Sequence, residues 1–160
     1  PKAAAAILVY PDCGLGDPLK PAPAAQQPTM FAMGELDDWT PVKQCRELLG
    51  GARRTDWIES HVYPGAHHSF DRGTAIADVA NASVSPAAPT AYLADDGSFI
   101  HPLQDRPDPA LTDRDLMVYG LKAGFGRKGA KIGSHDGEAA LFRDDMLAFW
   151  RRVLRGQPDR

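Results

Sequence analysis

Two short segments of the chain carry the residue types that hydrolytic catalysis requires. Residues 34–41 (GELDDWTP) offer carboxylates, and residues 63–72 (YPGAHHSFDR) offer imidazoles. A neutral histidine can take a proton from a nucleophile when its ring is held in one tautomer, and a carboxylate holds it by accepting the other ring N–H. Together the two segments could therefore supply the acid and the base of a catalytic triad.

Each segment directly follows a stretch that we expect to be a buried β-strand. These strands are Thr29 to Met33 and Asp56 to Tyr63, and the apolar run from Ala5 to Tyr10 predicts a third. Residues 40–51 combine an N-cap threonine, a proline at the first helical position and a terminal glycine pair, which predicts a helix. Strand, helix and strand with short links indicate a βαβ unit, and ligands bind beyond the carboxyl ends of strands in such sheets.

The rest of the chain has little regular pattern until its last helix. Residues 73–135 are rich in Pro, Gly and Asp, so we expect an irregular insertion with short helices, forming a lid or an excursion toward a partner. Glu138 to Leu154 has apolar residues at helical spacing, which predicts an amphipathic helix that packs on the sheet. We expect a single α/β domain over residues 1–160, and the start at Pro1, close to a strand, suggests a piece of a longer protein.

Three stretches resemble the dienelactone hydrolase family of the α/β hydrolases. FAMGELDDWTP is similar to the acid-bearing segment of that family, YPGAHHSFDR to its histidine-bearing segment, and AILVYPDCG to the strand that follows its nucleophile helix. The order of Asp before His also matches the family. This likeness covers roughly the first half of the chain and the closing helix. It implies the C-terminal part of an α/β-hydrolase fold, a mostly parallel sheet flanked by helices.

The resemblance assigns roles to three residues. Asp37 takes the place of the triad acid, His68 that of the base, and Arg72 that of a guanidinium that helps to hold a substrate carboxylate. It implies hydrolysis of small-molecule carboxylic esters or lactones without a metal or organic cofactor. The family's nucleophile turn, G-x-[CS]-x-G, is missing from the chain, and neither Cys13 nor Ser69 has the sequence surroundings of such a nucleophile.

Plainer structural interpretations stay open for these residues. Asp37 and Asp38 could cap the helix that begins near residue 41, and Arg72 could form a surface ion pair of little energetic value. We expect Trp39 to pack rather than to bind, and His61 to face solvent or a helix. The histidines have no carboxylate or cysteine at helical ligand spacing, so the sequence does not favour a metal site.

The missing nucleophile favours an alternative function. The chain could be a catalytically inactive fragment or a degenerate α/β-hydrolase fold that acts as a binding or self-associating module. A partial sheet exposes a strand edge, which either a second copy in a homo-oligomer or the missing N-terminal half could cover.

Composition excludes some partners. With 18 basic and 21 acidic residues, the formal charge of −3 provides no field that would attract nucleic acid or an anionic membrane. No apolar run approaches the roughly 20 residues of a membrane span. Cys13 and Cys45 are far apart in sequence and fit neither a disulfide framework nor a zinc site, so we expect free thiols. Free thiols lean toward a cytoplasmic location, although the compartment stays open.

Overall fold

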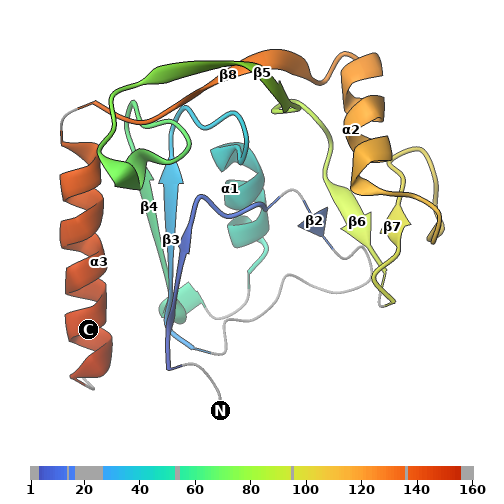
Figure 1. Ribbon diagram of the computed structural model, residues 1–160. Helices are drawn as coiled ribbons and strands as arrows, with labels where there is room; N and C mark the ends of the chain where they lie inside the picture. Colours follow the sequence, from blue (N-terminus) through green and yellow to red (C-terminus); the bar gives the residue numbers. More distant parts are fainter. Residues whose placement is uncertain are drawn as a thin grey trace.

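The computed structural model describes residues 4–13, 15–16, 27–52, 55–94, 96–135 and 137–155. It is a mixed α/β structure that combines a parallel three-stranded sheet with smaller sheets (Figure 1). The parallel sheet has the order β1 (Ala6–Val9), β3 (Thr29–Gly34) and β4 (Ile58–Tyr63), so β3 is its central strand. The three expected strands are therefore confirmed, and β3 and β4 lead directly into the acid-bearing and histidine-bearing segments.

A helix covers each face of the parallel sheet. The helices are α1 (Val42–Gly50) and α3 (Glu138–Leu154), both predicted from the sequence (Figure 1). Alternate residues of β3 face opposite sides, as the period of a strand requires. Met30 and Ala32 pack in a cluster with Phe142 and Phe149 of α3, whereas Phe31 and Met33 belong to a second cluster with Val42 and Cys45 of α1. Burial on both faces explains why β3 is almost wholly apolar.

The segment from 73 to 135 is more regular than its sequence suggested. We expected short helices there, and the described residues include one helix, with strands elsewhere. The elements are β5 (Ala77–Val84), β6 (Ala91–Leu93), β7 (Phe99–Ile100), α2 (Asp113–Lys122) and β8 (Arg127–Ile132). β5 and β8 form an antiparallel ribbon, while β6 pairs with β7 and with the short β2 (Leu15–Gly16). Two short 3-10 turns, Thr55–Trp57 and Phe70–Arg72, flank β4.

The ribbon of β5 and β8 passes across the carboxyl ends of β3 and β4 (Figure 1). Its end is bonded to the histidine-bearing segment, because the His67 backbone N–H donates to the Gly133 carbonyl (3.0 Å) and the Gly133 N–H donates to the His68 carbonyl (2.8 Å). The backbone that carries His68 is thus fixed from two sides, by β4 before it and by the ribbon beside it.

Cys13 and Cys45 form a disulfide, so the expectation of free thiols is wrong. The two residues are 32 positions apart in sequence, yet their Cα atoms lie 4.9 Å apart. The physical reason is tertiary: the segment after β1 and the helix α1 pack on the same face of the sheet, where both cysteines are buried. The bond joins the end of β1 to α1.

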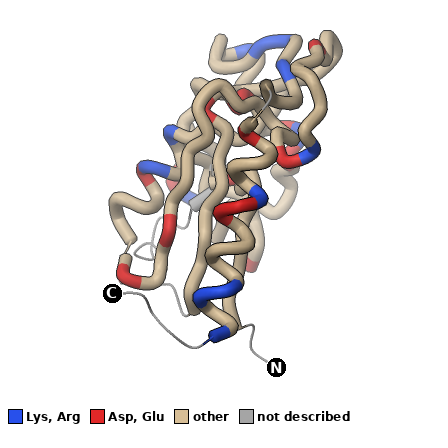
Figure 2. Tube along the Cα trace, turned by 90° about the vertical axis from the view of Figure 1, so that its left-hand side faces the viewer, with Lys and Arg blue, Asp and Glu red and all other residues tan. Residues whose placement is uncertain are grey.

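Helix α3 is held to β4 by polar contacts as well as by its apolar face. The Tyr63 hydroxyl donates to Asp145 (3.0 Å), Nδ1 of His61 lies 3.2 Å from the same carboxylate, and Arg152 pairs with Glu59. His61 therefore faces a helix, as one sequence interpretation expected. On this side of the molecule, acidic and basic residues are interspersed rather than gathered by sign (Figure 2). None of the described helices has both the length and the apolar character that spanning a membrane requires.

Candidate active site

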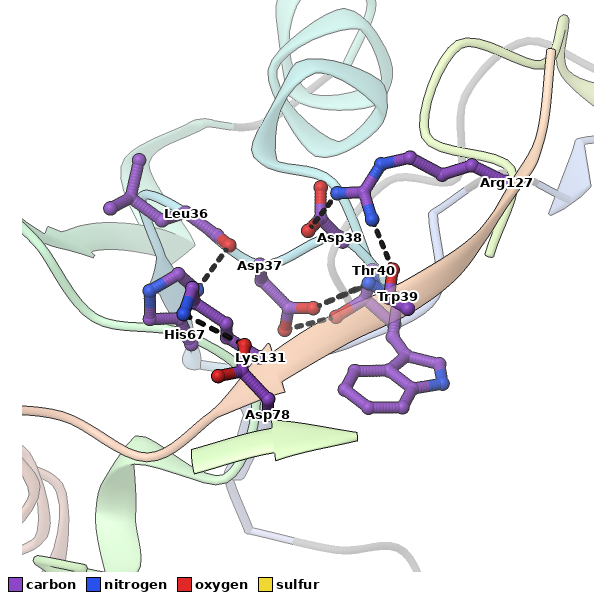
Figure 3. A network of polar contacts seen from close by, with 10 residues as sticks. Leu36, Asp37, Asp38, Trp39, Thr40, His67, Asp78, Arg127 and Lys131 are labelled. Atoms are coloured by element: carbon purple, nitrogen blue, oxygen red, sulfur yellow. Dashed lines mark hydrogen bonds and ion pairs between the residues drawn. The ribbon is translucent and has the colours of Figure 1, made fainter. Parts of the chain in front are cut away.

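Asp37 is buried in the turn that follows β3, and its carboxylate is bonded on both oxygens. Oδ1 accepts the backbone N–H groups of Trp39 (2.8 Å) and Thr40 (3.0 Å), and Oδ2 accepts the Thr40 hydroxyl (2.8 Å) (Figure 3). The side chain is 0% exposed. Asp37 organises the turn that leads into α1, but α1 begins without a side-chain cap, so the interpretation of Asp37 as a helix cap is wrong. These bonds also fix the direction in which Oδ2 points.

The imidazole of His68 meets that same oxygen. Nδ1 of His68 lies 2.8 Å from Oδ2 of Asp37. Because an ionised carboxylate can only accept, Nδ1 carries the proton and Nε2 keeps its lone pair. The His68 side chain is 24% exposed, so one side of the ring remains open while its partner is fully buried. The structure therefore brings together the two residues that the sequence proposed as acid and base.

The two segments approach closely because Gly34 has no side chain. A Cβ at position 34 would lie 2.6 Å from the carbonyl oxygen of Ala66 and 3.0 Å from that of His67. Backbone bonds cross the same gap, from Leu36 N–H to the Ala66 carbonyl (2.9 Å) and from Glu35 N–H to the Tyr63 carbonyl (3.1 Å). The missing side chain and these bonds set the separation of the Asp37 and His68 backbones.

His67, the other candidate imidazole, has a different environment. It is buried, and its Nδ1 is 2.9 Å from the carbonyl oxygen of Leu36 (Figure 3). This bond joins the histidine-bearing segment to the acid-bearing one, so His67 supports the geometry of the pair. Glu35 acts similarly, because its exposed carboxylate accepts the Gly65 backbone N–H at 3.0 Å.

Two aromatic rings lie against His68. The centroid of Tyr10 is 4.4 Å from that of the imidazole, and the centroid of Trp39 is 5.3 Å from it. From the sequence we expect Trp39 only to pack, and Tyr10 is not among the predicted site residues. The signal for Tyr10 was its place at the carboxyl end of the first predicted strand, where the carboxyl ends of parallel strands converge on one site.

Backbone strain is concentrated around the base. Tyr10 (φ 41°) and Ser69 (φ 61°) are the non-glycine residues with positive φ among the described residues. Tyr10 contacts the His68 ring, and Ser69 follows His68 in the chain. Steric clashes make positive φ unfavourable for a residue with a side chain. Such residues persist where the surrounding structure enforces this conformation, often at functional sites.

Arg72 is exposed and lies in the short 3-10 turn Phe70–Arg72. It is near enough to Tyr10 to influence the phenol. Partial burial of Tyr10, followed by the negative charge of Asp71, raises the pKa of Tyr10 above its ordinary 10.0, and the positive charge of Arg72 opposes that shift. Arg72 is therefore a neighbour of Tyr10, whose ring in turn contacts that of His68.

Neither sequence candidate for the nucleophile is placed for that role. Cys13 is bonded to Cys45 and has no free thiol. Ser69 is buried beside His68, and in the described part of the chain no serine, threonine or cysteine side chain hydrogen-bonds to the His68 ring. The acid and the base are thus assembled without a nucleophile from the described residues.

A hollow of about 890 Å³ opens between the acid-bearing segment, α1 and the ribbon. Its charges are largely paired, with Arg127 bonded to Asp38 (2.5 Å) and Lys131 to Asp78 (2.8 Å) (Figure 3). His67 lines this hollow and His68 does not. The acid Asp37 therefore borders this hollow and the base His68 does not.

The described residues contain no cluster of three or more His, Cys, Asp or Glu side chains placed to hold a metal ion. No protein-family model, no curated protein and no solved structure significantly matches this chain.

Proposed function

We propose that this chain provides the acid and the base of a hydrolase that acts on carboxylic esters or lactones. The observation that carries the proposal is the 2.8 Å contact between the Asp37 carboxylate and Nδ1 of His68. The two residues follow neighbouring parallel strands, where open α/β sheets place their ligand sites. A buried carboxylate that orients a partly exposed imidazole is the arrangement that general-base catalysis of acyl transfer needs.

The proposed reaction uses the free nitrogen of His68. Nε2 accepts the proton of an attacking hydroxyl or thiol, and the resulting imidazolium is stabilised by Asp37. The tetrahedral intermediate then collapses as Nε2 returns the proton to the leaving alkoxide. Water repeats the cycle and releases the acid. The nucleophile is a Cys or Ser outside these 160 residues, and backbone N–H groups hold the oxyanion.

The proposal includes a more specific assignment, namely a fold and an activity like those of dienelactone hydrolases. It is supported by the order of Asp before His, by three parallel strands that end at the site, and by a helix packed on each face of the sheet. Arg72 would hold a carboxylate on the substrate, which its exposed guanidinium near Tyr10 favours.

A second candidate function is favoured by the lack of a nucleophile bonded to His68. In it, the chain is an inactive hydrolase-like module that binds a ligand or associates through its sheet. β1 pairs with β3 on one side, and no other described strand pairs with its outer edge. An open edge can accept a strand from a second copy or from another part of the protein.

Hydrolysis of a short-chain aryl ester separates the two candidates. We would assay the 160-residue chain and any longer natural form that contains it, each with Asp37→Asn and with Asp38→Asn as the matched control. Removing the orienting carboxylate of such a triad lowers kcat by roughly 10⁴-fold. The hydrolase proposal expects that loss for Asp37→Asn, abolition for His68→Ala, and near-normal rates for Asp38→Asn. Absence of turnover in every form would favour the binding module.

A further inference from the structure

A second, smaller pocket of about 140 Å³ is lined by Trp39, whose ring also contacts the His68 imidazole. Its walls come from the acid-bearing segment, from the stretch between β5 and β6, and from α2. Most of its lining is apolar or aromatic and includes Trp39, Ala88, Pro89, Leu116, Met117 and Tyr119.

Two residues that contact the His68 ring, Trp39 and Tyr10, connect this pocket to the base. The Trp39 indole contacts the His68 ring at 5.3 Å and also lines the pocket. Tyr10 contacts the other part of the ring at 4.4 Å, and Asp12, two residues later, lines the pocket as well. The pocket and the exposed part of His68 are thus built from the same two short segments.

We propose that this pocket takes a small apolar substituent of the substrate, about the size of a phenyl ring, and that the segment between β5 and β8 sets this specificity. That the occupant of the pocket is part of a substrate rests on the proposed hydrolase function. A cavity of roughly 150 Å³ lined by apolar side chains is large enough to bind benzene. The larger hollow is a poorer candidate, because His68 does not line it and its charges are paired.

The first test measures binding without catalysis. The probe is 4-fluorobenzyl alcohol, followed by ¹⁹F NMR, against the wild-type chain, Ala88→Trp and Ala87→Trp. Ala88 lines the pocket, whereas its neighbour Ala87 is exposed and does not. The expected result is a probe signal that broadens and shifts with wild-type and Ala87→Trp protein, and that is unaffected by Ala88→Trp. Equal binding by Ala88→Trp, or no binding by the wild type, would overturn the proposal.

The second test uses turnover by the catalytically complete protein. For benzyl acetate and methyl phenylacetate, Ala88→Trp should lower kcat/KM by about tenfold or more for whichever ester places its ring in the pocket. Methyl acetate should be hydrolysed at an unchanged rate, because it has no ring to exclude. Leu116→Ala enlarges the pocket and should favour naphthyl esters, with Val118→Ala, an exposed change on the same helix, as control.

The two tests distinguish failure of the pocket from failure of the hydrolase. Probe binding that Ala88→Trp abolishes, with no esterase activity in any form, supports the pocket and contradicts the hydrolase. Esterase activity that depends on His68 and is indifferent to Ala88→Trp for every ester contradicts the pocket alone.

Discussion

Trp39 and His68 are both held by the carboxylate of Asp37. The backbone N–H of Trp39 donates to Oδ1, Nδ1 of His68 bonds to Oδ2, and the two aromatic rings lie 5.3 Å apart. One buried side chain therefore positions both the proposed base and the wall of the small pocket. A change at Asp37 should consequently alter the orientation of the His68 ring and the binding of the aromatic probe together.

The tautomer of His68 gives the first prediction. With Nδ1–H donating to Asp37, the proton NMR spectrum should contain a downfield imidazole N–H signal that Asp37→Asn shifts upfield or broadens into exchange with water. His67 provides an internal control, because its own Nδ1 bonds to the Leu36 carbonyl and should keep its signal. A His68 signal unchanged in Asp37→Asn would mean that the contact does not form in solution.

The disulfide gives the second prediction. Replacing both Cys13 and Cys45 by Ala should lower the free energy of unfolding by about 4 kcal/mol, because the bond closes a loop of 32 residues in the unfolded chain. Urea denaturation measures this difference. A reductant should destabilise the wild type by a similar amount and leave the double variant unaffected. If wild type and variant unfold at the same urea concentration without reductant, the bond does not form.

Gly34 gives the third prediction. Gly34→Ala places a methyl group 2.6 Å from the Ala66 carbonyl oxygen, so the two segments must separate. We expect a loss of about 1–3 kcal/mol in stability, typical of overpacking. We also expect a loss of any His68-dependent activity larger than the loss of folded protein explains. Gly50→Ala is the matched control, since nothing lies within 4 Å of its added methyl group. Equal tolerance of both changes would contradict the close approach.

The phenol of Tyr10 gives the fourth prediction. Its pKa is raised above 10.0 by partial burial and by the Asp71 charge, so the folded state favours the neutral phenol. The sign follows from linkage: this contribution to stability is complete below pH 10 and is lost as the pH rises through the folded pKa. The absorbance titration of wild type minus Tyr10→Phe isolates this residue. Asp71→Asn should move the Tyr10 pKa down, and an upward movement would contradict the assigned cause.

The parts of the fold predictable from sequence are those that bury much apolar surface. β3 lies under helices on both faces, which forces a continuous apolar run, and α3 needs an apolar stripe. The turn residues beside Gly34 and Gly65 carried enough local pattern to locate Asp37 and His68. Resemblance to a known family then selected the two residues that meet.

The ribbon and the disulfide were not predictable for physical reasons. Half of the residues in β5 and in β8 are exposed, and neither strand carries the alternation of apolar and polar residues that marks a half-buried strand. The pairing of Cys13 with Cys45 depends on where β1 and α1 pack, and sequence spacing contains no information about that packing. Tyr10 and the small pocket were missed similarly, because their neighbours are distant in the chain.

The strands β5 and β8 lie at the two ends of one stretch of the chain, from Ala77 to Ile132. They pair side by side across the site. Apart from Asp12, Gln44 and the acid-bearing segment, the residues that line the small pocket all lie between those paired strands. We therefore expect that residues 85–126 can be replaced as one unit. A graft with a different α2 could retune which compounds are accepted without disturbing Asp37 and His68.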